Sequence, residues 1–304
     1  MKKMFMAVIA LMMTISASAQ FYIYCSDGNV IKVDSISMIA PGGTDTPNPS
    51  AGIGVFSVSD SKQVTFSPGN LQYHPANDKW RFAESQTDYI GEANNNISET
   101  YYGWLDLFGW STSATNFGVS TSQDYTDYLG SFVDWGTNKI GNDAPNRWRT
   151  LTSAEWDYLL NGRPYANWLK GGAQVNGVNG LILLPDNWTC PSGVTFKSGF
   201  YVFENEPGYD GESGFGLQQT FTAEQWSMLK NSGAVFLPAA GMRVQSYIAL
   251  TVQYGGAYWS ATECDDAGGE DGYTADNLIF VSSGCSFISY PRCYGMSVRL
   301  VKDL

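Results

Sequence analysis

The stretch TSAEWDYLLNG, residues 152–162, predicts a short helix whose two ends are both marked in the sequence. Thr152 and Glu155 form a capping box, in which each side chain accepts a hydrogen bond from a backbone N–H at the start of the helix. The apolar residues that follow fall on one helical face, and Gly162 is placed to end the helix.

A second segment, TAEQWSMLKNSG at 222–233, has the same pattern, with Thr222 and Gln225 as the capping pair. Each helix is followed by a short apolar strand that ends in Leu-Pro. The expected strands are 180–185, 234–238, 63–66, 80–82, 255–260, 277–281 and 296–301. Two short helices among short strands predict an α+β fold rather than a doubly wound sheet. The segments 263–273 and 282–294 have almost no apolar periodicity, and we predict surface loops there.

The first 19 residues have the three parts of a signal peptide. Lys2 and Lys3 are a positive start, residues 4–15 are apolar, and Ala17-Ser18-Ala19 is a cleavage site of the A-x-A type. The apolar run is shorter than the roughly 20 residues that a membrane helix needs, and no second run follows. We therefore expect an exported protein, periplasmic, on the cell surface or secreted, with no membrane span.

The rest of the chain divides at a stretch rich in proline and glycine. Residues 20–40 read as a short β segment, with a hairpin between 21–24 and 30–33. Residues 41–53 contain three prolines and no apolar pattern, which indicates a linker. Residues 54–304 have no comparable interruption, so we expect one large domain there.

The composition excludes two classes of partner. The chain has 304 residues, 15% charged residues, 14% aromatic residues, 33 glycines and a net charge of −12. A protein this acidic lacks the basic face that nucleic acids and anionic membranes require, so neither is expected as a partner. Few charges with many glycines and aromatic rings favour a loop-rich β protein.

Four motifs, taken together, resemble one family. They are RWRTLT at 147–152 with Glu155-Trp156, FLPAAG at 236–241 with Arg243, YWSAT at 258–262, and Gly295 with SVRLV at 297–301. In this order they resemble the formylglycine-generating-enzyme-like (sulfatase-modifying-factor) branch of the C-type lectin fold. Within it the chain looks similar to secreted FISUMP-like paralogous-domain proteins of gut bacteria and to variable proteins of diversity-generating retroelements. The resemblance covers about 56–304.

The resemblance implies a C-type-lectin-like domain with short mixed strands, two short helices and long loops. It also implies that loops near the C-terminal strands contact the ligand. Two functional alternatives remain, and the first, a formylglycine-generating-type oxidase, comes from the same resemblance. The enzymes of this branch use a reactive cysteine pair near the C-terminus, and Cys285 and Cys293 lie in roughly that region, although the surrounding residues do not match the enzyme's motif. A structural module of a surface filament is the other alternative.

Metal binding has little support in the sequence. His74 is the only histidine, and the five cysteines show no regular spacing, so neither a zinc site nor a disulfide framework is indicated. Calcium needs six to eight oxygen ligands, which the acidic residues near 265 could supply. The Glu-Pro-Asn or Gln-Pro-Asp motif of calcium-dependent lectins is absent, however. We therefore predict no cofactor and leave Ca²⁺ as the weaker alternative.

Tyrosine among serine, glycine and asparagine is typical of binding loops, because a rigid ring gives contact area and small polar residues give adaptable hydrogen bonds. The two C-terminal loops have this composition, and we predict that they bind the ligand. The candidate residues are Asp265, Asp266, Glu270, Asp271, Tyr273, Ser283, Phe287, Ser289, Tyr290, Arg292 and Tyr294. No catalytic residue and no metal ligand is predicted.

The function expected from these observations is non-catalytic recognition of a protein or glycan at a cell surface. Residues 282–294 also contain no Glu, Lys, Met, Gln or Trp. Adenine-directed mutation of Asn-type codons cannot produce these five residues, so the loop is a candidate for retroelement diversification. Most tryptophans lie in helix or strand patterns and are expected in the core, among them Trp156, Trp226 and Trp259.

Overall fold

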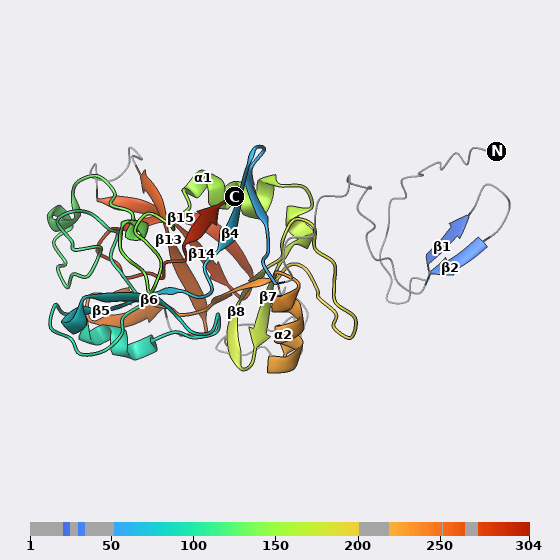
Figure 1. The fold of residues 1–304 in the computed structure, drawn as a ribbon, viewed down its shortest axis with the longest axis horizontal. Helices are drawn as coiled ribbons and strands as arrows, with labels where there is room; N and C mark the ends of the chain where they lie inside the picture. Colours follow the sequence, from blue (N-terminus) through green and yellow to red (C-terminus); the bar gives the residue numbers. More distant parts are fainter. Residues whose placement is uncertain (1–20, 25–29, 34–51, 201–218, 251, 265–272) are drawn as a thin grey trace. The chain divides into compact units, whose positions relative to one another are not determined.

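The computed structural model describes residues 21–24, 30–33, 52–200, 219–250, 252–264 and 273–304 (Figure 1). The chain divides into two units, Met1–Pro47 and Asn48–Leu304. In the first unit, β1 (Phe21–Tyr24) pairs antiparallel with β2 (Val30–Val33), which confirms the expected hairpin. The predicted signal peptide and nearly all of the predicted linker lie outside the described residues.

The second unit is a mixed α+β structure of several small sheets and a few short helices. One sheet has the order β16-β4-β3, and another has the order β10-β8-β7-β9. The remaining pairs are β5 with β6 and β11 with β12, and a three-stranded sheet has the order β13-β14-β15. The strands are β3 (Phe56–Ser59), β4 (Lys62–Phe66), β5 (Leu71–His74), β6 (Lys79–Phe82), β7 (Lys170–Val175), β8 (Val178–Leu183), β9 (Thr220–Phe221), β10 (Val235–Pro238), β11 (Met242–Val244), β12 (Tyr247–Leu250), β13 (Gly255–Cys264), β14 (Thr274–Val281), β15 (Gly284–Pro291) and β16 (Val301–Asp303).

Both helices predicted from the capping boxes are present. In α1 (Ser153–Asp157), the hydroxyl of Thr152 accepts from Glu155 N at 3.2 Å, and the Glu155 carboxylate accepts from Thr152 N at 3.0 Å. In α2 (Ala223–Asn231), Thr222 and Gln225 make the same exchange. One π-helical turn, η5 (Tyr158–Gly162), continues α1. The 3-10 turns are η1 (Pro75–Asn77), η2 (Gly91–Asn96), η3 (Tyr125–Tyr128), η4 (Trp135–Thr137) and η6 (Ala166–Trp168).

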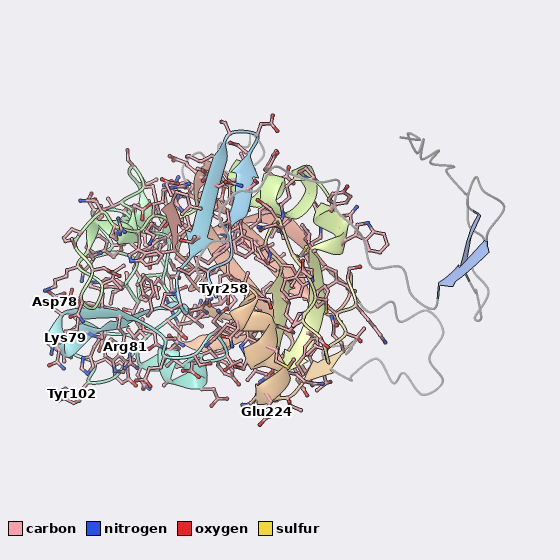
Figure 2. All side chains as sticks on the ribbon, turned by 45° about the vertical axis from the view of Figure 1, so that its right-hand side comes forward. Asp78, Lys79, Arg81, Tyr102, Glu224 and Tyr258 are labelled. Carbon is pink, nitrogen blue, oxygen red and sulfur yellow. The ribbon has the colours of Figure 1, made fainter. Side chains whose placement is uncertain are left out.

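The sheet β13-β14-β15 separates two hydrophobic clusters, because successive side chains of a strand point to opposite faces. On one face Tyr258 and Leu278 pack with Trp156 of α1. On the other face Trp259 and Ala275 pack with buried residues from several segments. Tyr258 is fully buried, and Figure 2 labels it near the middle of the view. A third cluster lies under α2, where Trp226 and Leu229 meet β8 and β10. The tryptophans expected in the core at 156, 226 and 259 are therefore buried.

The prediction of a surface loop at 282–294 is wrong. Residues 284–291 form β15, which pairs along its whole length with β14, with Phe287 opposite Leu278. The strand is rich in serine, but Cys285 and Phe287 alternate with more exposed residues and pack against the core. Only one side of an edge strand needs to be apolar, so the periodicity is weak in the sequence.

Two other segments also differ from expectation. Glu263 and Cys264, expected in a loop, extend β13, while 265–272 lies outside the described residues. The segment 296–301, expected as one strand, is divided: Met296 and Ser297 form single bridges with Phe108 and Tyr258, and only Val301 belongs to a strand, β16. Within the described residues no helix is long and apolar enough to cross a membrane.

A buried carboxylate holds the segment 90–97 against 105–107. Asp106 is fully buried and accepts hydrogen bonds from Ile90 N and from the Asn94 amide, both at 2.8 Å. The Asn94 side-chain oxygen in turn accepts from Asp106 N at 2.9 Å and Leu107 N at 3.0 Å. Among the described residues Asp106 has no cationic partner within 4.0 Å. Burial therefore raises the pKa of Asp106 from 3.8 to about 6, although the hydrogen bonds act in the opposite direction.

This raised pKa predicts a pH-dependent stability. Well below pH 4, Asp106 is protonated in both the native and the unfolded chain. As the pH rises, the unfolded chain releases this proton first, so the free energy of unfolding falls by about 2 kcal/mol from this group between pH 4 and pH 7. Urea unfolding of the wild type and of Asp106→Asn at pH 4 and pH 7 tests this, because the variant lacks this loss.

The expected result is that Asp106→Asn gains about 2 kcal/mol on the wild type between the two pH values, whatever its offset at pH 4. Asp127→Asn, at an exposed position, serves as the matched control and should follow the wild type. Parallel pH profiles for the wild type and Asp106→Asn would show that Asp106 does not have the raised pKa.

Candidate functional site

Five tyrosines gather around the segment that follows β15. The rings of Tyr290 and Tyr294 have centroids 5.7 Å apart, and those of Tyr125 and Tyr273 are 6.0 Å apart. The pKa of the Tyr294 hydroxyl is raised first by burial, and then by the nearby phenols of Tyr125, Tyr247 and Tyr290 and by the Cys293 thiol. Tyr294 is thus near enough to three of the other tyrosines to interact with them electrostatically. We call Tyr125, Tyr247, Tyr273, Tyr290 and Tyr294 the tyrosine patch.

The rings of the tyrosine patch come from separate parts of the chain. Tyr125 starts the turn η3, where the Asp124 carboxylate accepts from Thr126 N at 3.0 Å. Tyr247 starts β12, Tyr290 lies near the end of β15, and Tyr273 directly precedes β14.

Their exposure suits contact with a partner. The side chains of Tyr125 and Tyr247 are exposed, at 41% and 54%. Tyr273, Tyr290 and Tyr294 are half-buried, and the last two pack against the hydrophobic cluster that contains Trp259. In the patch, Tyr290 and Tyr294 are therefore fixed by packing against the core, while Tyr125 and Tyr247 are accessible to a partner.

Arg292 holds together the backbone beneath the patch. Its side chain is fully buried, and its guanidinium lies 4.2 Å from the centroid of the Trp110 ring. The guanidinium donates to the carbonyl oxygens of Thr274 at 3.0 Å, Tyr128 at 3.2 Å and Gly130 at 3.3 Å, and it forms an ion pair with Glu263. Its backbone N–H donates to Tyr273 O at 2.9 Å. Arg292 thus joins β13, β14 and the end of η3 through one side chain.

A second buried arginine, Arg243, bonds to the segment next to Tyr294, and we call Arg292 and Arg243 together the base of the patch. It is fully buried, and one of its terminal nitrogens donates to Gln245 O at 2.7 Å. Its backbone exchanges two hydrogen bonds with Gly295, each of 2.8 Å. A Cβ on Gly295 would lie 2.8 Å from Nε of Arg243, so this approach of the two chain segments requires glycine. Burial lowers the pKa of Arg243, against the opposing effect of Tyr128 and Cys293.

The remaining candidate residues do not join the tyrosine patch. Phe287 and Ser289 lie on the α1 side of β15, where Phe287 packs against the core and Ser289 donates to Asp276 at 2.8 Å. With Ser153, Ala154 and Asp157 they line a shallow groove. Ser283 is exposed in the turn between β14 and β15. The predicted set therefore occupies two separate surfaces.

Arg292 was expected on a ligand-contacting loop, but it is buried and bonded within the fold, so that expectation is wrong for its side chain. Asp265, Asp266, Glu270 and Asp271 lie outside the described residues. In the part of the chain that the structure describes, no group of three or more His, Cys, Asp or Glu side chains could hold a metal ion.

Sequence reasoning missed Tyr125 and Tyr247. A signal was present for Tyr125, because STSQDYTDY at 120–128 has the same tyrosine-rich polar composition as the C-terminal segment. Tyr247, next to Gln245 and Ser246, is similar. What the sequence could not show is that tertiary pairing brings these segments to Tyr294.

The cysteines of the described residues, Cys190, Cys264, Cys285 and Cys293, form no disulfide with one another. Cys285 lies at the start of β15 and Cys293 two residues beyond its end, so extended backbone separates them by roughly 25 Å. Burial raises the pKa of both thiols, that of Cys293 to about 11. Neither thiol has the lowered pKa of a reactive cysteine.

In comparisons with known proteins, the chain matches no family model, no curated protein and no solved structure. The tyrosine patch and its buried base are therefore the observations on which a functional proposal rests.

The role of Arg292 predicts a large effect of a conservative change. Arg292→Lys keeps the charge but loses the planar fork that reaches three carbonyl oxygens and Glu263, which leaves buried acceptors unpaired. We expect the free energy of unfolding, measured by urea denaturation, to fall by about 2–3 kcal/mol. Arg147→Lys, at an exposed position, is the control. Equal stability of the two variants would contradict this role.

Proposed function

We propose that this chain is an exported, non-catalytic recognition protein that binds a protein or glycan at a cell surface through the tyrosine patch. The observation that carries the proposal is the convergence of five tyrosines from separate segments on one surface. Tyrosine combines a large rigid contact area with a hydroxyl that can donate or accept, which suits a binding surface.

The base of the patch supports the same proposal. Recognition loops gain affinity when they are held in one conformation before binding, since less conformational entropy is lost. Arg292 fixes the backbone below Tyr273 and Tyr294, and Arg243 fixes the segment around Gly295. A patch built in this way presents its rings without rearrangement.

For the fold we propose the C-type-lectin-like architecture of the formylglycine-generating-enzyme-like branch. Beyond the mixed α+β arrangement, the support is that the four resembling motifs meet one another. Arg149 bridges to Val301, Arg243 to Gly295, and Tyr258 to Ser297. The hydroxyl of Thr262 also accepts from Ser153 N at 2.9 Å. Motifs spread over about 150 residues therefore form one connected region.

Retroelement diversification of 282–294, if it occurs, has to spare part of this segment. Arg292 and Cys293 are buried, and Arg292 bonds to several backbone groups, so changes there carry a cost in stability. Ser283, Ser286 and Ile288 are exposed and can vary without that cost. We propose that diversity, where present, falls on such positions. A near-copy of the coding region beside a reverse-transcriptase gene would support this, and a genome without both would refute it.

The oxidase alternative requires two cysteines that act at one reacting position. Cys285 and Cys293 lie at opposite ends of β15, and the pKa of each is raised rather than lowered. No specific observation therefore favours catalysis over binding. Sulfatase-type peptides incubated with the purified chain and analysed by mass spectrometry provide the direct check. Conversion of the peptide cysteine to formylglycine, lost in Cys293→Ser, would overturn the binding proposal.

The binding proposal predicts different effects of changes in the tyrosine patch and in the groove between β15 and α1. A screen of glycans and cell-surface proteins first identifies a ligand of the wild type. The double variant Tyr125→Ala, Tyr247→Ala removes the two most exposed rings of the patch, and we expect it to weaken that binding at least tenfold. The matched control is Phe287→Ala, Ser289→Ala on the α1 side, which should bind like the wild type.

The opposite pattern, with loss of binding only in the control variant, would assign recognition to the groove between β15 and α1. Unchanged binding in both variants would refute the proposed site. The unfolding midpoint of each variant without ligand distinguishes lost contacts from lost folding.

A further inference from the structure

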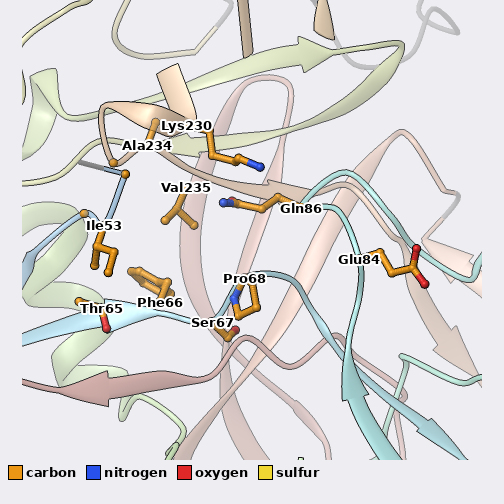
Figure 3. A pocket seen from close by; sticks show the side chains of 13 residues that line it. Ile53, Thr65, Phe66, Ser67, Pro68, Glu84, Gln86, Lys230, Ala234 and Val235 are labelled. Carbon is orange, nitrogen blue, oxygen red and sulfur yellow. The ribbon is translucent and has the colours of Figure 1, made fainter. Parts of the chain in front are cut away.

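One cavity shares no lining residue with the tyrosine patch. Its volume is about 270 Å³, and it is lined by the start of the second unit, the end of β4, the segment 84–86 and the region after α2 (Figure 3). Ile53, Phe66, Pro68 and Val235 supply apolar walls, and Gln86 and Lys230 supply polar groups.

Gln86 is fixed in one orientation. Its side chain is 8% exposed, and its oxygen accepts from Phe236 N at 2.6 Å and from the Arg299 guanidinium at 2.9 Å. Because both donors hold the oxygen, the amide nitrogen is the end left for the cavity. Figure 3 shows the nitrogen of Gln86 turned toward Val235 and Lys230. Among the described residues, this nitrogen donates to no acceptor.

Positive charge faces the same wall. Lys230 lines the cavity together with Gln86 (Figure 3), and within the described residues Lys230 has no acidic partner within 4.0 Å. Arg299 is fully buried and bonds to Gln86, and within the part of the chain that the structure describes its guanidinium bonds only to the neutral side chains of Asn70 and Gln86. Glu84 is the one acidic residue of the lining, and its carboxylate points away from Lys230 and Gln86.

The charge of Arg299 persists at neutral pH. Burial lowers the pKa of its guanidinium to about 10, which still leaves it protonated near pH 7. A buried cation that meets only neutral partners creates an unbalanced positive potential, and an amide that bonds to it is polarised so that its N–H donates more strongly.

We propose that this cavity binds a small carboxylate with a compact apolar body. The carboxylate accepts from the Gln86 amide and the Lys230 ammonium, and the apolar body packs against Phe66 and Val235. Charge-assisted hydrogen bonds of this kind are about twice as strong as those between neutral groups. Pockets for drug-sized ligands have volumes of roughly 300–1,000 Å³, so this smaller cavity suits a molecule of about ten non-hydrogen atoms. A bare phosphate would leave the apolar walls unused.

Benzoate is the test probe, benzamide its neutral match, and inorganic phosphate the anion without an apolar body. Calorimetric titration of the purified chain measures each dissociation constant, and saturation-transfer NMR reports contact with the ring. We expect benzoate to bind, with benzamide and phosphate at least tenfold weaker. Lys230→Gln should weaken benzoate binding about tenfold. Lys139→Gln, an exposed lysine outside the cavity lining, should leave it unchanged.

A second variant tests the location of the binding site without changing a charged residue. Ile53→Trp, at a position that is 53% exposed, fills the mouth of the cavity and should abolish benzoate binding while the unfolding midpoint is retained. The proposal is overturned if benzoate fails to bind at millimolar concentration. It is also overturned if benzamide or phosphate binds as tightly as benzoate, or if Lys230→Gln and Ile53→Trp both bind like the wild type.

Discussion

The sheet β13-β14-β15 is the constraint on which the large unit depends, because it has a hydrophobic cluster on each face. Adjacent residues of β13, such as Tyr258 and Trp259, therefore contribute to different clusters. A shift of one residue in register would exchange the two sets, placing each ring against the wrong partners. The position of the tyrosine patch follows from this register, since Tyr273 and Tyr290 lie directly before β14 and near the end of β15.

Although the chain has few charged residues, several arginine side chains are buried in its interior. Arg243, Arg292 and Arg299 are all buried, and of these only Arg292 has a carboxylate partner among the described residues. The guanidinium groups of Arg292 and Arg299 bond to backbone carbonyls or side-chain amides from separate segments, which lets one residue hold several parts of the chain at once. In a fold with long irregular connections, such bonds add to the backbone pairing that the small sheets provide. Around Arg299, the lack of a carboxylate partner among the described residues leaves positive potential behind the cavity for which we propose a carboxylate ligand.

The success of prediction from sequence depended on whether the signal was local. Both capping boxes lie within four residues, and both helices are present where Thr152 and Thr222 mark them. The strand β15 was mistaken for a loop, because an edge strand with one polar side resembles a loop in composition. Among the candidate residues, Tyr290 and Tyr294 were found from composition alone and meet in space, whereas Tyr125 and Tyr247 reach them only through pairings that no local window contains. The burial of Arg292 depends on Trp110, Tyr128 and Glu263, and it could not be inferred from its polar neighbours.

The pairing of β16 with β4 has a consequence for the timing of folding. Val301 lies opposite Phe66, and both pack in or against the cluster that contains Trp156. The first sheet of the unit is therefore incomplete until its last strand has been synthesised. A ribosome-bound chain that lacks residues 301–303 cannot close this sheet, and long-range pairing of this kind also slows folding. Completion of this sheet therefore comes at the end of synthesis, after every other described strand is available to pair.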